Sequence, residues 1–314
     1  MAPSIHTMSK SNPVVQADDP VAIFGGPYSN LEATRAFFDE MACRAMPPEH
    51  IVCTGDVVAY CADAAATTAL VRKSGCHVVM GNVEESLAAG AVDCGCGFEE
   101  GSICDRLSAL WYAHAAAQIS ADDRDWMGRL PRQLVLAIGG FRFAVVHGGV
   151  EQINRTIYAS TDPLIKLAEI EKAGLDGVIG GHCGLPFTQS IGGRLWHNCG
   201  AIGIPANDGT PRVWYSVFRP EVGGVTIEHC ALAYDHAAAA AEMRRAGLPE
   251  EYAAVLDSGL WVSVDTLPMN EKQAGGINLE PGEVIWQPEL VASTPDDRRQ
   301  LWPATAELVR AKTS

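Results

Sequence analysis

Four side chains that can bind a metal ion each follow a short apolar run in this sequence. They are Asp56, Asn82, His147 and His182, and a glycine adjoins each of them. Glycine allows the backbone and a ligand to approach each other closely. Carboxylate and amide oxygens together with imidazole nitrogens suit Zn, Mn or Fe. Each residue alone is equally typical of a turn, a helix cap or a buried core histidine, but the four together predict a site for a divalent transition metal.

The apolar runs before these residues are short, rich in β-branched residues and bounded by Gly or Asp, which is typical of buried strands. Helical patterns separate them, so the order of elements predicts an α/β fold. In such folds ligands bind beyond the carboxyl ends of the strands, where the four side chains lie. The predicted strands are residues 21–24, 51–54, 78–80, 134–138, 141–146 and 178–179, and the predicted helices are residues 31–43, 64–73, 104–119 and 163–173.

The rest of the chain predicts a single catalytic domain with an appendage. Residues 1–19 are polar and are expected to form a flexible leader, and residues 20–235 the domain itself. Within that domain, residues 212–218 and 224–232 are expected to pair as antiparallel strands. Residues 236–314 begin with Ala-rich helical patterns and continue with Pro, Gly and charged residues. We expect them to pack on the core as a helical and irregular extension.

Composition narrows the classes of partner. Hydrophobic residues make up 47% and charged residues 19%, which is typical of a soluble globular protein. The formal net charge of −15, without a concentrated basic patch, argues against a nucleic-acid partner. No apolar run is long enough to cross a membrane and no secretory signal precedes the domain. We therefore expect a cytoplasmic protein that acts on a small molecule, and a homo-oligomer is possible.

The chain has 10 cysteines, and without a secretion signal they point to a reducing compartment. Cys94 and Cys96 lie close together and Cys104 follows, but Cys-Gly-Cys is not a zinc-finger spacing. Three interpretations stay open: buried or loop thiols, a metal or redox cluster, or a tight turn beside the site. Cys183 adjoins His182 and could bind a soft metal as a thiolate.

The order of these blocks resembles the calcineurin-like metallophosphoesterases, in particular their YfcE-like bacterial branch. That family carries five blocks, DxH, GD, GNH, H and GHxH, and its YfcE-like branch often opens with SDIHGNLEAL. The resemblance covers about residues 20–232 and implies a four-layer α/β/β/α sandwich. The matching segments are Asn30-Leu31-Glu32-Ala33, Gly55-Asp56, Gly81-Asn82, His147-Gly148-Gly149, Gly181-His182 and the turn from Asn198 to Gly203.

The departures from the family pattern fall mainly on one of its two metal sites. The family's first Asp corresponds to Gly26, its first His to Tyr28, and the second His of GHxH to Gly184. Of the ligands of that site only Asp56 remains. The other site keeps Asp56, Asn82, His147 and His182, so the resemblance implies a mononuclear centre or a second ion with unfamiliar ligands. The family's proton-donating His becomes Val83, which leaves no acid at that position.

Five residues are candidates for substitute roles. Tyr28 could bind substrate or, as phenolate, a metal, or it could fill the vacated space. Glu84 could orient a ligand, act as an acid–base or cap the following helix. His197 could enter the site or hold a loop, and Arg155 could clamp an anionic group or form a surface salt bridge. Asn30, in the first matching segment, is a candidate for substrate binding.

The resemblance implies a metal-dependent hydrolase of a small phosphate ester or related compound, in which a metal-bound water attacks. An enzyme of another class, with a single Lewis-acid or redox metal on the same fold, is the second hypothesis, because one fold hosts many activities. A non-catalytic binding protein is the third. The sequence names neither the substrate nor the metal.

Overall fold

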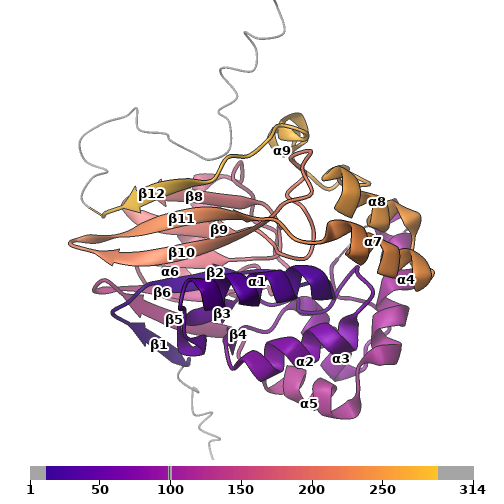
Figure 1. The fold of residues 1–314 in the computed structure, drawn as a ribbon. Helices are drawn as coiled ribbons and strands as arrows, with labels where there is room; N and C mark the ends of the chain where they lie inside the picture. The colour runs from indigo at the N-terminus through magenta and orange to yellow at the C-terminus, as the bar shows by residue number, and fades with distance from the viewer. Residues whose placement is uncertain (1–11, 98, 100, 289–314) are drawn as a thin grey trace, which may run out of the picture.

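Two six-stranded sheets pack face to face and helices cover their outer faces (Figure 1). The structure, a computed structural model, describes residues 12–97, 99 and 101–288. One sheet has the strand order β1-β5-β6-β7-β9-β8 and the other the order β12-β11-β10-β2-β3-β4. The strands are β1 (Val14–Ala17), β2 (Val21–Phe24), β3 (Ile51–Cys53), β4 (His77–Val78), β5 (Gln133–Ile138), β6 (Phe141–Val146), β7 (Gly177–Gly180), β8 (Pro186–Ile191), β9 (Arg194–Cys199), β10 (Val213–Glu221), β11 (Gly224–Leu232) and β12 (Gly282–Trp286).

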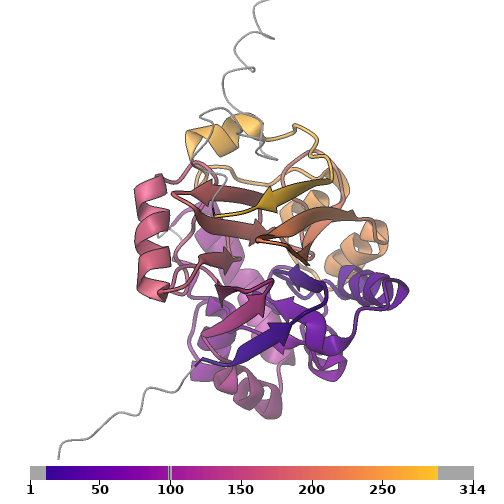
Figure 2. The ribbon, with the colours of Figure 1, turned by 90° about the vertical axis from the view of Figure 1, so that its left-hand side faces the viewer.

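Three of the four buried hydrophobic clusters in the described residues follow from this arrangement, and the fourth packs around Trp111 and Leu256 among the helices. Fully buried side chains such as Ile23, Phe143 and Leu195 fill the space between the sheets. Phe37 packs on the outer face of one sheet and Ile170 on the outer face of the other, which confirms the predicted four-layer sandwich (Figure 2). The helices are α1 (Leu31–Cys43), α2 (Ala64–Ser74), α3 (Asn82–Ala89), α4 (Ile103–Gln118), α5 (Ala121–Arg129), α6 (Pro163–Ala173), α7 (His236–Arg245), α8 (Glu250–Ser258) and α9 (Met269–Ala274).

Parallel pairing directs the carboxyl ends of neighbouring strands to one edge. Strands β2, β3 and β4 are parallel in one sheet, and β6 and β7 are parallel in the other. Strand β2 is buried along its whole length, as expected for a strand covered on both faces. The segments that leave these strands therefore meet at the seam between the sheets, where the four predicted ligands lie.

The expected flexible leader is wrong for residues 14–17. These residues form β1, which pairs in parallel with β5 from Val14 opposite Val135 to Ala17 opposite Ile138. Their side chains alternate between exposed and buried, and Val15 and Ala17 enter the core between the sheets. Burial of these alternate side chains holds the segment as an edge strand. Residues 1–11 of the leader lie outside the described residues.

The segment after residue 235 contributes both to the sheet and to the helical layer. Helix α7 lies against α1 and α8, and β12 pairs with β11 in antiparallel register (Figure 1). The ring of Trp286 in β12 is buried against Phe141 and Phe143, with centroid separations of 5.0 and 5.4 Å. Among the described helices, none is long and apolar enough to span a membrane.

Removal of the Trp286 side chain tests how far this strand belongs to the core. We expect Trp286→Ala to lower the free energy of unfolding by about 3–5 kcal/mol, because it leaves a cavity between the sheets. Its neighbour Ile285 is 63% exposed, so Ile285→Ala is the matched control and is expected to change stability by less than about 0.5 kcal/mol. Urea unfolding of both variants measures the difference. Equal small effects would show that β12 adds little to the core.

Candidate metal centre

Four donor atoms from four different strand ends converge on one point. The Nε2 atom of His147 lies 3.0 Å from Asn82 Oδ1, 3.0 Å from His182 Nδ1 and 3.2 Å from Asp56 Oδ2. Asp56, His147 and His182 each offer a ligand atom within 4.8 Å of the others. Asp56, Asn82 and His147 are almost wholly buried. The structure therefore brings together all four side chains that the sequence singled out as metal ligands.

The turns that carry two of these residues are held in an unusual conformation. Asp56 and His182 have φ angles of 53° and 61°, in the left-handed region that residues with a Cβ seldom occupy. Such strain persists where the surroundings fix it, and it clusters at functional sites. Gly81 lies beside this turn, and a Cβ on it would be 2.2 Å from Asp56 Oδ1. The glycine before Asn82 is therefore required for close approach.

The imidazole of His147 is oriented by the backbone of the opposite sheet. Its Nδ1 lies 2.8 Å from the carbonyl oxygen of Thr54, at the end of β3. Because a carbonyl oxygen only accepts, Nδ1 carries a proton. Nε2 faces the acceptor oxygens of Asp56 and Asn82, and although burial lowers the pKa of His147, the nearby Asp56 carboxylate raises it overall, so a metal ion would take the place of a proton on Nε2. This arrangement, in which the outer ring nitrogen is fixed by a carbonyl, is typical of metal-binding histidines.

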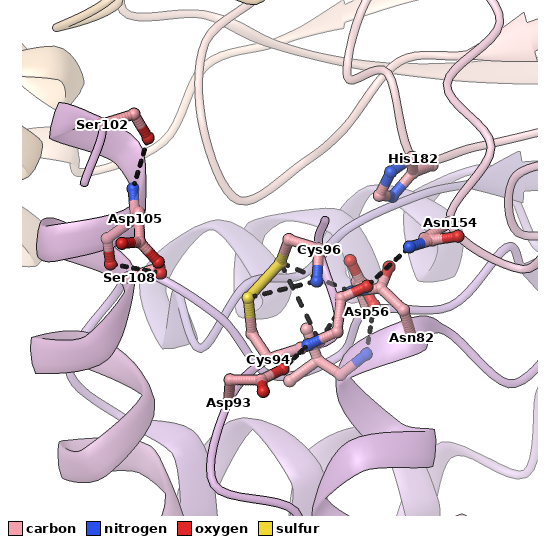
Figure 3. Close-up of a disulfide and its surroundings, with 12 residues drawn as sticks. Asp56, Asn82, Asp93, Cys94, Cys96, Ser102, Asp105, Ser108, Asn154 and His182 are labelled. Carbon is pink, nitrogen blue, oxygen red and sulfur yellow. Dashed lines mark hydrogen bonds between the residues drawn. A yellow bond between two sulfur atoms is a disulfide. The ribbon is translucent and has the colours of Figure 1, made fainter. Parts of the chain in front are cut away.

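The Cys94-Gly95-Cys96 turn orients the amide of Asn82 (Figure 3). The Nδ2 of Asn82 donates to the carbonyl oxygen of Cys94 at 2.9 Å and lies 3.4 Å from Cys96 Sγ. With its nitrogen held by the turn, Asn82 directs Oδ1 to the cluster. Cys94 and Cys96 form a disulfide, and Asn154 Nδ2 donates to Gly95 O at 2.9 Å. The disulfide argues against free thiols at these two positions, whereas a redox pair and a tight turn beside the site both agree with the geometry.

Glu84 supports the loop that carries Asp56. It is fully buried, and its Oε2 accepts from the backbone N–H groups of Asp56 at 2.8 Å and of Gly81 at 2.9 Å. Its Oε1 accepts from the N–H of Val58 at 3.3 Å. Burial and the nearby charge of Asp56 raise the pKa of Glu84 to about 7. Because backbone donors occupy both oxygens, the geometry favours the positioning and helix-capping roles over that of an acid–base.

Burial and the neighbouring charges together set the protonation of the ligands. Burial lowers the pKa of His182 to about 4, together with the nearby charge of His147. His182 is therefore neutral at neutral pH, as a metal ligand must be. Burial alone would raise the pKa of Asp56, but His147 and His182 outweigh it and the pKa of Asp56 is lowered. One carboxylate, one amide oxygen and two imidazoles suit a divalent transition metal.

Aromatic rings lie over the glycines at two positions where ligands were expected to be missing. A Cβ on Gly26 would be 2.3 Å from Cζ of Tyr28, so the tyrosine ring covers that glycine. A Cβ on Gly184 would be 3.4 Å from Cζ2 of Trp261, which comes from the segment after α8. Burial raises the pKa of Tyr28 well above its ordinary value, so its hydroxyl is a neutral hydrogen-bond donor. This argues against the phenolate alternative.

The remaining candidates do not converge on the centre. His197 lies between the sheets, where its Nδ1 is 2.9 Å from Thr188 Oγ1 and its ring lies 5.0 Å from that of Phe218, so its place among the catalytic residues was wrong. Side chains alternate along β9, and His197 falls on the inner face.

Arg155 and Asn30 are engaged elsewhere. The Nη1 of Arg155 is paired with the buried Glu169 at 2.8 Å, which corresponds to the salt-bridge alternative. Asn30 caps α1 and donates to Gly203 O at 2.8 Å. Asn30 is buried and engaged, so the structure contradicts its assignment to substrate binding. The side chain of Arg155 is 33% exposed, and its assignment stays a prediction. Cys183 directs its thiol to the carbonyl of Leu185 at 3.5 Å, and burial raises its pKa to about 12, which argues against a thiolate ligand.

Comparison with known proteins supports the sequence resemblance. A family model described as the calcineurin-like phosphoesterase superfamily domain matches residues 23–218. The crystal structure of a metallophosphoesterase from Sphaerobacter thermophilus is similar, with a TM-score of 0.61 and 24% identity, over 78% of this chain and 100% of that chain. A hypothetical protein from Pyrococcus horikoshii OT3 has a TM-score of 0.63 and 16% identity, over 77% of this chain and 99% of that one. Both likenesses show the fold, and no curated protein matches the chain.

Replacement of a ligand tests the centre by metal affinity. We expect His182→Ala to weaken binding of Zn²⁺ or Mn²⁺ by at least about 100-fold, since loss even of an outer partner costs 10–100-fold. Isothermal titration of chelator-treated protein measures this. His236, half-buried at the start of α7 and paired with Asp257 at 3.2 Å, provides the control His236→Ala, which should bind as the parent does. Unchanged affinity in His182→Ala would rule out this set of ligands.

Proposed function

Since the chain belongs to the calcineurin-like phosphoesterase superfamily, we propose that it hydrolyses a small phosphoester at a centre that holds one divalent metal ion. Proteins of this family use divalent metals. The observation that carries the proposal is the convergence of Asp56, Asn82, His147 and His182, with Nε2 of His147 within 3.2 Å of a donor atom from each of the other three. A relic without a ligand would not need two oriented imidazoles. The assignment to the YfcE-like branch stays a prediction.

Two aromatic rings near the centre support the proposal that it holds a single ion. The rings of Tyr28 and Trp261 lie over Gly26 and Gly184, and neither glycine has a side-chain donor. Asp56 is the only residue left from that second set of ligands. An aspartate restored at position 26 would collide with the ring of Tyr28. The two rings therefore occupy the space beside Gly26 and Gly184. The other set of donors, Asp56, Asn82, His147 and His182, is complete.

The chain's own residues then have distinct tasks. An ion bound at the centre would polarise a phosphoryl oxygen and lower the pKa of a bound water. Asp56 supplies the only negative charge among the four donors, and Thr54 keeps the proton of His147 on Nδ1. Tyr28 lines the same cavity as Asp56 and His182, and we propose that its hydroxyl donates to an ester oxygen. Val83 is buried and has no proton to give, so the leaving group must depart without an acid from that position.

Removal of the charge of Asp56 tests the proposed hydrolysis. With Mn²⁺ or Zn²⁺ supplied, we expect the protein to hydrolyse 4-nitrophenyl phosphoesters. Asp56→Asn should lower kcat/KM by at least about 100-fold, because both metal affinity and the local charge fall. Asp257→Asn, on the surface of α8, is the control and should retain activity. Equal activity in Asp56→Asn and the parent would contradict the proposal.

A second variant separates the ring of Tyr28 from its hydroxyl. Tyr28→Phe keeps the cover over Gly26 and removes only the donor. We expect kcat/KM to fall about tenfold, which corresponds to one lost hydrogen bond, while metal stoichiometry and thermal stability stay unchanged. A kcat/KM equal to that of the parent would show that the ring serves only to fill space.

A further inference from the structure

A chamber of about 440 Å³ opens above the metal centre. Asp56 and His182 reach it from the centre, and Tyr28 lines it beside them. This volume is within the usual range for small-molecule sites, about 300–1,000 Å³. A substrate whose phosphoryl group lies at the centre would therefore extend the rest of its molecule into the chamber.

Two segments outside the strand ends contribute apolar side chains to the walls of the chamber, which the loop of Cys96 and Glu99 and the segment of Thr156 and Tyr158 complete. Helix α4 contributes Ile103 and Leu107, and the segment from α8 onward contributes Val255, Trp261 and Val262. These side chains are all apolar or aromatic. Ile103 and Val262 remain 44% and 38% exposed, so the chamber presents apolar surface to solvent that an apolar ligand would cover.

An aromatic series connects the centre to the outer wall. The ring of Tyr60 lies 5.0 Å from Tyr28 and 5.2 Å from Tyr252, measured between centroids. All three tyrosines line the chamber. A further aromatic ring could pack against this series from the side of the chamber, in the edge-to-face geometry that aromatic pairs prefer. The chamber therefore suits an organic group with a flat or bulky apolar surface.

The charges of the chamber favour a substrate with one negative charge. Among the described residues that line it, none is Lys or Arg, and Glu99 adds a carboxylate. Because no Lys or Arg among these lining residues would offset a second negative charge, and the carboxylate of Glu99 would repel it, the lining favours a singly charged ester over a doubly charged one. A doubly charged ester would leave a negative charge in an apolar chamber without a partner, which is costly.

We propose that the substrate is a phosphodiester with a single negative charge and a bulky apolar ester group, which the chamber binds. The diester chemistry rests on the proposed function, whereas the apolar subsite rests on the chamber itself. In the reaction the oxygen of water bonds to phosphorus and the P–O bond to the apolar alcohol breaks. The alcohol leaves with one proton, and the phosphomonoester and a second proton are the other products.

Binding of matched anions to the metal-loaded protein tests the subsite apart from turnover. Diphenyl phosphate and dimethyl phosphate carry the same single charge and differ only in apolar surface. By isothermal titration we expect diphenyl phosphate to bind at least about tenfold more tightly, given the extra apolar area that it buries. Phenyl phosphate, which carries two charges at pH 8, should bind more weakly than diphenyl phosphate. Equal affinities for the diphenyl and dimethyl esters would overturn the proposal.

Two lysine substitutions on α4 provide a matched pair. Leu107 lines the chamber, whereas Leu110 on the same helix does not and is 58% exposed. Leu107→Lys should weaken the binding of diphenyl phosphate and strengthen the binding of phenyl phosphate, each by about fivefold or more, because a cation replaces apolar surface. Leu110→Lys should leave both affinities unchanged. The same effect from both variants would overturn the subsite.

Hydrolysis of the same compounds keeps the two proposals distinguishable. Preferential binding of diphenyl phosphate, reduced by Leu107→Lys, supports the subsite even if no ester is hydrolysed, and that lack of turnover would overturn the proposed function instead. Hydrolysis of bis(4-nitrophenyl) phosphate and of methyl 4-nitrophenyl phosphate with equal kcat/KM would keep the function and overturn the subsite.

Discussion

The hydrogen bond between His147 Nδ1 and the carbonyl oxygen of Thr54 joins the two sheets at the point on which the centre depends. His147 follows β6 in one sheet and Thr54 follows β3 in the other. Packing of the apolar inner faces brings these strand ends together, and the bond fixes the ring that the other donors surround. Glu84 performs the same task for Asp56 through backbone donors. The fold thus determines the geometry of the centre before any ligand binds.

The segment after α8 contributes both to the fold and to the surroundings of the centre. Rings of Tyr28 and Trp261 cover the glycines at two positions that lack ligands, and Trp261 comes from a segment far along the chain. The same C-terminal segment that supplies β12 to the sheet also supplies much of the chamber wall. Trp261 therefore both covers Gly184 and helps to form the cavity beside the centre.

The fold and the four candidate metal ligands could be predicted from the sequence, for physical reasons. Strand ends in a parallel sheet share one edge, so Asp56, Asn82, His147 and His182 could be placed together from apolar runs and order alone; the family match adds independent support for the fold. Strand β1 was missed because four residues with one alternation are too short a signal. The side chain of His197 could not be directed from sequence, because one residue of register decides which face of β9 it occupies. Likewise, the contact of Trp261 with Gly184 depends on tertiary packing and leaves no local pattern.

Anomalous diffraction from crystals of the metal-loaded protein, recorded at the absorption edge of the bound metal, tests the central claim most directly. We expect one peak, coordinated by Asp56, Asn82, His147 and His182, with the rings of Tyr28 and Trp261 still in place over Gly26 and Gly184. Two peaks roughly 3.5–4 Å apart would contradict the one-ion centre and show that other groups have rebuilt the second site. A single peak away from these four residues would contradict the assignment of the ligands.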